Sequence, residues 1–134
     1  MLIGIFADAH DHVDNVRQAV ARFNRAGCEL VVFAGDFVSP IVIPRLRKLR
    51  CPVLACFGDN EGNRVGIAGG MRIIGEVGDP PFGFQTPDGI RILVTHSLDT
   101  LRGLTEGCDV VVFAAGSGGN TPAEMTDKVD RDGA

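Results

Sequence analysis

Five short apolar runs, rich in β-branched residues, alternate with helix-like segments along this chain. The runs cover residues 2–7, 30–34, 53–57, 90–95 and 109–114. Continuous apolar runs of this length are typical of strands that are covered on both faces, as in parallel sheets. The alternation therefore predicts an α/β fold, because helices that connect parallel strands pack on the faces of the sheet.

Helix-like patterns occupy three of the intervals between these runs. The clearest pattern covers residues 13–27, where apolar residues recur at helical spacing and Gly27 marks the end. Two further helices are expected at residues 40–50 and 99–106. No repeat or linker divides the chain, so residues 1–134 are predicted to form a single domain.

Two stretches depart from this alternation. Between about residues 62 and 82 the glycine content rises and no clear pattern emerges. The sequence FGFQTPDGIRILVT, residues 82–95, is typical of two strands around a Pro-Asp-Gly turn. Part of the sheet structure is therefore expected to be antiparallel.

Composition excludes several classes of protein. No apolar run approaches the ~20 residues that a membrane span needs. The net charge of −4 gives no general reason to expect a nucleic-acid partner, and the basic residues of PRLRKLR (44–50) are interpreted as a solvated helix face. The cysteines lack a C-x-x-C pair and neighbouring histidines, which favours reduced core thiols in a cytoplasmic protein. They are Cys28, Cys51, Cys56 and Cys108.

Polar side chains follow four of the apolar runs at the point where each run ends. Asp8 and His10 follow the first run, and residues two apart point the same way from an extended chain. Open α/β sheets place their sites at the carboxyl ends of their strands. With the later runs included, the candidate residues are Asp8, His10, Asp36, Asp59, Asn60 and His96.

These residue types indicate a metal site. Oxygen and imidazole ligands without thiolate suit Mn²⁺, Fe, Ni²⁺, Mg²⁺ or Zn²⁺. Asp36 has two oxygens and is able to bridge a pair of ions about 4 Å apart, an arrangement used for phosphoryl chemistry. Each residue alone also has a structural interpretation, as a helix cap, turn or loop residue. Their occurrence at four strand ends favours the site, with Asp11 and His12 expected to support its first loop.

The order of these motifs resembles that of the calcineurin-like metallophosphoesterases, and in particular the small single-domain phosphodiesterases of bacteria and archaea. That family carries the motifs D-x-H, G-D, G-N, H-G and G-H-x-H. The corresponding segments here are Asp8-Ala9-His10, Gly35-Asp36, Gly58-Asp59-Asn60 and Thr95-His96-Ser97. The resemblance extends over residues 1 to about 114 and includes DxHDHxxNxRxA and GDFVS.

The resemblance implies an α/β sandwich of mixed sheets flanked by helices. It also implies a hydrolase with two divalent ions, in which a hydroxide between the ions attacks a small phosphodiester or nucleotide-like substrate. Asp36 would bridge the ions, with Asp8 and His10 on one of them and His96 and the residue at 59 or 60 on the other. The residues assigned to catalysis are Asp36, Asn60 and His96.

Three positions differ from the family pattern. The order Asp59-Asn60 leaves open which of the two is the ligand, and Ser97 stands where the family has glycine. The G-H-x-H motif is missing, because the last apolar run continues as AGSGGNTPAEM. The only other histidine, His12, is expected to be structural or to support a ligand. Each ion would therefore keep three protein ligands, one of them shared.

The missing histidines leave the level of activity open. Weak, labile metal binding is expected, with a need for added Mn²⁺ or for ligands from a partner chain. The fold is expected to be C-terminally truncated or divergent, with residues 115–134 as a Gly/Ser-rich and charged tail. An exposed sheet edge would then favour a homo-oligomer. This tail also carries oxygen-bearing residues, but nothing in their spacing supports them as replacements for the histidines: Ser117, Asn120, Thr121, Glu124 and Asp127.

The sequence also allows two alternatives to a metal-dependent phosphodiesterase. One is a non-catalytic protein-binding scaffold on the same fold, as in a retromer subunit that this architecture resembles. The other is nucleotide binding at a phosphate loop. Neither G-x-x-x-x-G-K-[ST] nor G-x-G-x-x-G occurs, and GIAGG (66–70) is interpreted as a flexible loop. The sequence therefore favours the enzyme over the scaffold and a flexible loop over a phosphate loop.

Overall fold

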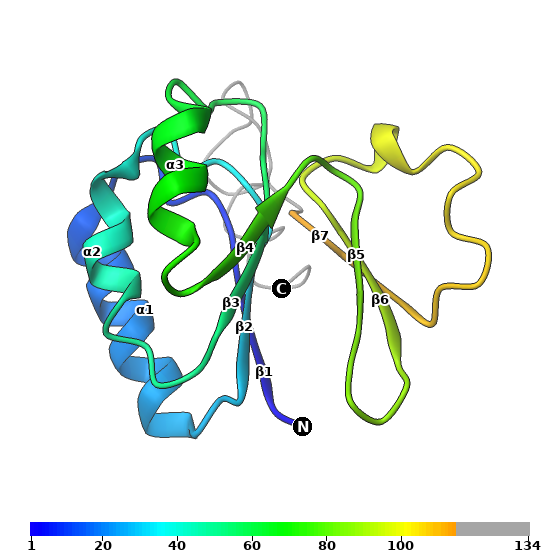
Figure 1. The fold of residues 1–134 in the computed structure, drawn as a ribbon, viewed down its shortest axis with the longest axis horizontal. Helices are drawn as coiled ribbons and strands as arrows, with labels where there is room; N and C mark the ends of the chain where they lie inside the picture. Colours follow the sequence, from blue (N-terminus) through cyan, green and yellow to red (C-terminus); the bar gives the residue numbers. More distant parts are fainter. Residues whose placement is uncertain (115–134) are drawn as a thin grey trace, which may run out of the picture.

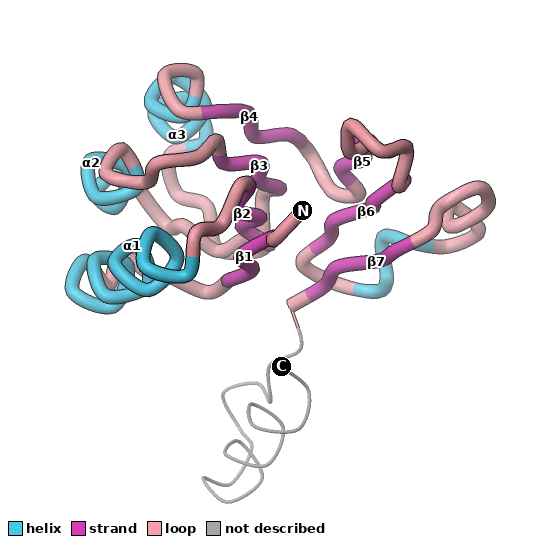
Figure 2. Tube along the Cα trace, turned by 90° about the horizontal axis from the view of Figure 1, so that it is seen from below, coloured by secondary structure: helices cyan, strands magenta, loops and turns pink. Residues whose placement is uncertain are grey.

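The computed structural model describes residues 1–114 and arranges them in three layers (Figure 1). Helices cover one face of a four-stranded sheet, and a three-stranded sheet lies against its other face (Figures 1 and 2). This mixed α/β architecture confirms the predicted fold class. The tail predicted for residues 115–134 lies outside the described residues.

The four-stranded sheet is entirely parallel, with the strand order β1-β2-β3-β4. All four residues of β2 are buried, as expected for a central strand covered on both faces. The strands are β1 (Ile3–Phe6), β2 (Leu30–Phe33), β3 (Val53–Cys56) and β4 (Gly75–Gly78). Three of the four correspond to predicted runs.

The three-stranded sheet is mixed. Strands β5 (Phe82–Gln85) and β6 (Arg91–Thr95) are antiparallel, which confirms the predicted hairpin. The turn between them closes where the backbone N–H of Thr86 donates to the carbonyl of Ile90 at 2.9 Å. Strand β7 (Val110–Phe113) pairs with β6 in parallel.

Helix α1 (Val13–Ala26) confirms the clearest helical prediction. His12 caps its first turn, because its Nδ1 accepts a hydrogen bond from the backbone N–H of Asn15 at 3.3 Å. Gly27 ends the helix in the left-handed conformation, with φ of 77°. The structural role expected for His12 is therefore the one found.

The helix expected at residues 40–50 is wrong in length. The chain instead forms a 3₁₀ turn η1 (Pro40–Val42) and a short helix α2 (Ile43–Leu46). Beyond it, the side-chain amide of Asn24 donates to the carbonyl of Lys48 at 2.9 Å and accepts from the N–H of Arg50 at 3.0 Å. Asn24 thus binds the N–H of Arg50, which in a longer helix would donate to the carbonyl of Leu46.

The helix expected at residues 99–106 is also wrong in length. The structure forms only a short 3₁₀ helix here, η2 (Leu98–Leu101), and Ser97 caps its N-terminus. The serine Oγ accepts a hydrogen bond from the backbone N–H of Asp99 at 3.3 Å.

Helix α3 (Arg64–Met71) and strand β4 were not predicted, and the interpretation of residues 66–70 as a loop is wrong. Three glycines lower the helix propensity of this segment and hide its pattern. Two features nevertheless define the helix. Asn63 Oδ1 accepts from the N–H of Gly66 at 2.9 Å as an N-terminal cap, and Ile67 and Met71 are fully buried against the sheet.

Two apolar cores hold the layers together. One lies between the helices and the parallel sheet, where Phe33 stacks on Phe37 with ring centroids 3.9 Å apart. The other lies between the two sheets and includes Val32, Cys56 and Val94. All four cysteines are free thiols. Within the described residues, no helix has both the length and the apolar character needed to cross a membrane.

The role of α3 in the core can be tested with two isoleucines. Ile67 is completely buried in α3, whereas Ile73, just beyond it, is 70% exposed. We expect Ile67→Ala to lower the free energy of unfolding by about 2–5 kcal/mol, because it leaves a cavity. Ile73→Ala should change it by less than about 0.5 kcal/mol. Urea denaturation measures both, and equal effects would contradict the placement of α3.

Candidate metal centre

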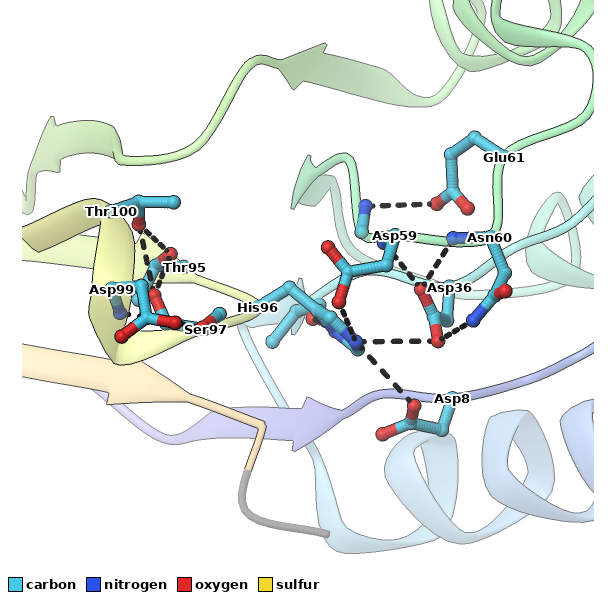
Figure 3. Close-up of polar contacts among 12 residues, drawn as sticks. Asp8, Asp36, Asp59, Asn60, Glu61, Thr95, His96, Ser97, Asp99 and Thr100 are labelled. Atoms are coloured by element: carbon cyan, nitrogen blue, oxygen red, sulfur yellow. Dashed lines mark hydrogen bonds and ion pairs between the residues drawn. The ribbon is translucent and has the colours of Figure 1, made fainter. Parts of the chain in front are cut away.

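The carboxyl ends of β1, β2, β3 and β6 bring their polar side chains into one cluster (Figure 3). The loops that follow β1 and β2 stay side by side beyond the strands. The N–H of Asp8 donates to the carbonyl of Gly35 at 2.9 Å, and the N–H of His10 donates to the carbonyl of Asp36 at 3.1 Å. These bonds fix the position of the first loop relative to Asp36.

Asp36 is the central carboxylate of the cluster, with a side chain only 3% exposed. Its Oδ1 accepts hydrogen bonds from the backbone N–H groups of Asp59 at 2.8 Å and Asn60 at 3.1 Å. Its Oδ2 accepts from the side-chain amide of Asn60 at 2.8 Å. Burial opposes the charge, but the hydrogen bonds outweigh it and hold the pKa of Asp36 below its usual value. Asp36 is therefore an anion within the protein.

Two imidazoles face this carboxylate. His10 Nε2 lies 3.2 Å from Asp36 Oδ2 and 3.3 Å from Asp8 Oδ1. His96 Nε2 lies 3.3 Å from the same Asp36 oxygen and 3.8 Å from Asp8 Oδ1. The ligand atoms of Asp8, His10 and Asp36 all lie within 4.8 Å of one another. The structure thus joins residues that are far apart in the sequence.

The ring of His96 is oriented by the backbone. Its Nδ1 lies 2.8 Å from the carbonyl oxygen of Ala34. A carbonyl only accepts, so Nδ1 carries the proton and the lone pair of the neutral ring is on Nε2, facing the carboxylates. Burial opposes protonation, yet the bond to Ala34 and the nearby carboxylates outweigh it and raise the pKa of His96. In the neutral ring, the lone pair of Nε2 is therefore available to bind a cation.

Negative charge accumulates around the imidazoles. Burial raises the pKa of Asp8, although the hydrogen bond from His10 partly offsets this effect. Asp59 adds a third carboxylate, with its Oδ2 4.0 Å from His96 Nε2. Three carboxylates beside two imidazoles leave excess negative charge, which a divalent cation would neutralise.

The donor set fits a hard or borderline metal ion. It consists of carboxylate oxygens and imidazole nitrogens, which suit Mg²⁺, Mn²⁺, Fe, Ni²⁺ or Zn²⁺. Strand β3 ends in Cys56, but burial raises the pKa of this thiol to about 12. Cys56 is therefore a protonated core residue and not a thiolate ligand. The residues present fit a divalent metal.

Asp59 and Asn60 take different positions (Figure 3). The carboxylate of Asp59 faces His96, whereas the amide of Asn60 donates to Asp36 Oδ2. In this arrangement Asp59 presents a free oxygen to the cluster and Asn60 orients Asp36. The choice of metal ligand between these two residues stays a prediction.

The loops around the site have an unusual backbone. Left-handed φ values are rare for residues other than glycine and cost free energy. They occur here at Asp8, His10, Asp11, Asp36 and Val38. Asp11 helps to hold this conformation, because its Oδ1 accepts from the N–H of Ser39 at 3.0 Å and from its hydroxyl at 2.8 Å. This contact is the loop support expected of Asp11.

Two glycines set the distance between the loops that follow β2 and β3. A Cβ on Gly58 would clash with the backbone N and the side-chain Oδ1 of Asp36. A Cβ on Gly35, which has φ of 94°, would lie 2.8 Å from the Cα of Gly58 and 2.9 Å from His96 Nδ1. Only glycine fits at either position, so the motifs G-D and G-D-N are packing requirements of the site.

Comparison with known proteins agrees with this geometry. The family model of the calcineurin-like phosphoesterase superfamily domain matches residues 1–120 of this chain. This chain therefore belongs to the calcineurin-like phosphoesterase superfamily. The expected family resemblance is confirmed.

Particular relatives are phosphodiesterases by name. Phosphodiesterase MJ0936 of Methanocaldococcus jannaschii is 40% identical over 76 residues, which cover 57% of this chain and 46% of that protein. The matched part is thus less than half the length of this curated relative. A solved structure described as a novel archaeal phosphodiesterase is 32% identical, with a TM-score of 0.76. That match covers 84% of this chain and 72% of the solved one.

The glycine contact can be tested with two alanine substitutions. We expect Gly58→Ala to lower the free energy of unfolding by about 1–3 kcal/mol, because the methyl group forces the two loops apart. Gly69→Ala is the control, since Gly69 lies in α3 and a Cβ added there would meet nothing within 4 Å. That variant should gain up to about 1 kcal/mol from helix propensity. A Gly58→Ala protein as stable as the wild type in urea denaturation would contradict the contact.

Proposed function

We propose that this chain is a phosphodiesterase that hydrolyses small phosphodiesters or nucleotide-like substrates with two divalent metal ions. The observation that carries the proposal is the position of Asp36 Oδ2, which lies 3.2 Å from His10 Nε2 and 3.3 Å from His96 Nε2. A carboxylate between two imidazoles is suited to bridge two ions.

The distances around Asp36 suggest how the ligands would be divided between two ions. Asp8 Oδ1 lies 3.3 Å from His10 Nε2, and these two residues would hold the first ion with Asp36. Asp59 Oδ2 lies 4.0 Å from His96 Nε2, and these two would hold the second ion with Asp36. When bound, such ions lower the pKa of water and neutralise the oxygens of a phosphate.

The protein's own groups define how a substrate reaches the site. The side chains of Asp8 and His10 are 44% and 49% exposed, whereas those of Asp36 and His96 are 3% and 11% exposed. The substrate would therefore approach over Asp8 and His10, with Asp36 and His96 as the floor of the site. Asn60 contributes by holding the Asp36 carboxylate in one orientation through its amide. This is the role we propose for Asn60 in catalysis.

The number of ligands bears on the strength of metal binding, and their type bears on the choice of metal. Each ion would have three protein ligands from the described residues, with Asp36 shared. Three protein ligands plus water form an acceptable catalytic site, although binding should be weaker than with four. We propose Mn²⁺ as the first metal to test, in line with the oxygen and imidazole donors. The oxygen-bearing residues of the tail lie outside the described residues.

The competing scaffold hypothesis makes a different prediction, because a protein-binding surface needs no bound metal. The convergence of two imidazoles on one buried carboxylate favours the enzyme. A cytoplasmic location and the single domain of residues 1–134 stay predictions.

Substitution of the bridging carboxylate tests the function directly. We expect Asp36→Asn to reduce Mn²⁺ affinity and the hydrolysis of bis-p-nitrophenyl phosphate by at least about 100-fold, since both ions lose a ligand. Asp14→Asn is the control, because Asp14 is 74% exposed on α1. Calorimetric titration and a colorimetric assay measure the two effects. Mn²⁺ binding without turnover in the wild type would favour a retained but idle site, and no Mn²⁺ binding would favour the scaffold.

We also propose that chains associate through a sheet edge. Strand β1 has β2 as its one partner among the described strands, and Ile5 on β1 is 53% exposed. We expect Ile5→Arg to keep the protein monomeric, because a charge on an edge strand blocks pairing. Ile41→Arg is the control, since Ile41 is 56% exposed in η1. Light scattering coupled to size exclusion measures the mass, and a monomeric wild type at all concentrations would refute the association.

A further inference from the structure

Glu61 joins the loops after β2 and β3 without belonging to the cluster of candidate ligands. Its Oε1 accepts hydrogen bonds from the backbone N–H of Phe37 at 3.0 Å and from that of Gly58 at 3.1 Å. Phe37 directly follows Asp36, and Gly58 directly precedes Asp59. One carboxylate oxygen therefore ties together the backbones that carry two candidate ligands.

This arrangement mirrors that of Asp36. The carboxylate of Asp36, on the loop after β2, binds backbone N–H groups of the loop after β3. The carboxylate of Glu61, on the loop after β3, binds the N–H of Phe37 on the loop after β2. We call this pair of carboxylates and the amides they bind the reciprocal clasp. Hydrogen bonds to a charged acceptor are roughly twice as strong as neutral ones.

The segment that Glu61 holds is strained. Asp36 and Val38, on either side of Phe37, have φ values of 66° and 74°. The left-handed conformation is an outlier for a β-branched residue such as valine. A further bond, from the N–H of Gly62 to the carbonyl of Val38 at 2.8 Å, anchors the same segment. Strained backbone persists only where surrounding interactions determine it, and Glu61 supplies one of them.

Glu61 is a costly residue to place here. Its Oε2 is buried and has no hydrogen-bond partner among the described residues. A buried carboxylate oxygen without a partner destabilises the fold, and an apolar side chain of similar size would avoid this cost. The benefit of the carboxylate is therefore found in Oε1 and in the backbone geometry that it maintains.

We propose that Glu61 is a positioning residue for the metal centre, which holds Asp36 and Asp59 at ligand distance through the amides of Phe37 and Gly58. The proposal rests on the proposed function, because it assigns Glu61 a purpose in metal binding. Glu61 itself acts through the backbone and contributes no ligand.

Two isosteric substitutions separate positioning from simple packing. Glu61→Gln keeps an acceptor oxygen for Phe37 and Gly58, whereas Glu61→Met keeps the volume and removes the acceptor. We expect the folded Met variant to bind Mn²⁺ at least about 10-fold more weakly than the wild type in calorimetric titration. The Gln variant should stay within about 3-fold of the wild type. Glu106→Gln, on an exposed loop, is the control.

The outcomes distinguish the hypotheses. Wild-type Mn²⁺ affinity in a folded Met variant would overturn the positioning role, even if the variant is less stable. Equal losses in the Met and Gln variants would also overturn it, because the retained acceptor would then have no effect. A wild type that binds no Mn²⁺ contradicts the proposed function instead.

Amide hydrogen exchange in the metal-free protein provides a readout that does not depend on metal binding. The neutral acceptor of Glu61→Gln should accelerate exchange at Phe37 and Gly58 more than at β2, because its hydrogen bonds are weaker. This measurement also decides the case in which Glu61→Met does not fold. Unchanged exchange at both amides in Glu61→Gln would overturn the clasp.

Discussion

The buried negative charge of Asp36 is the constraint on which the rest of the site depends. A carboxylate removed from water is stable only when hydrogen bonds or cations replace its hydration. Here the backbone of the loop after β3 satisfies Oδ1, while Oδ2 is left facing His10 and His96. The loop after β3 therefore folds around a side chain of the loop after β2. The geometry of the candidate ligands is built into the fold itself, which is the preorganisation that a metal site needs.

Parallel strands make this contact available, and glycines set its distance. Because β1, β2 and β3 run in the same direction, their carboxyl ends meet at one edge of the sheet. Gly35 and Gly58 then allow the second and third loops to approach more closely than any side chain permits. The left-handed residues of these loops cost free energy, and the apolar cores on both faces of the sheet supply the stability that offsets it.

Local patterns predicted most of the fold because each depends on residues that are close in sequence. The apolar runs of β1, β2, β3, β6 and β7 and the periodicity of α1 fall in this class. Helix α3 was missed because its glycines weaken the local signal, although burial of Ile67 and Met71 stabilises it in the folded protein. The helix at residues 40–50 was predicted too long because Asn24 binds Lys48 and Arg50, which follow it by 24 and 26 residues.

The sequence by itself determined the types of candidate ligand and their placement at strand ends, because residue identity and the end of an apolar run are both local properties. The tertiary structure alone decided which atoms meet. It turned Asp59 toward His96 and Asn60 toward Asp36, and it placed Glu61 against the amide of Phe37. These contacts join loops more than twenty residues apart, and they depend on the backbone angles and on the approach of the two loops. No periodicity along the chain encodes such geometry, since it arises only when the sheet has formed.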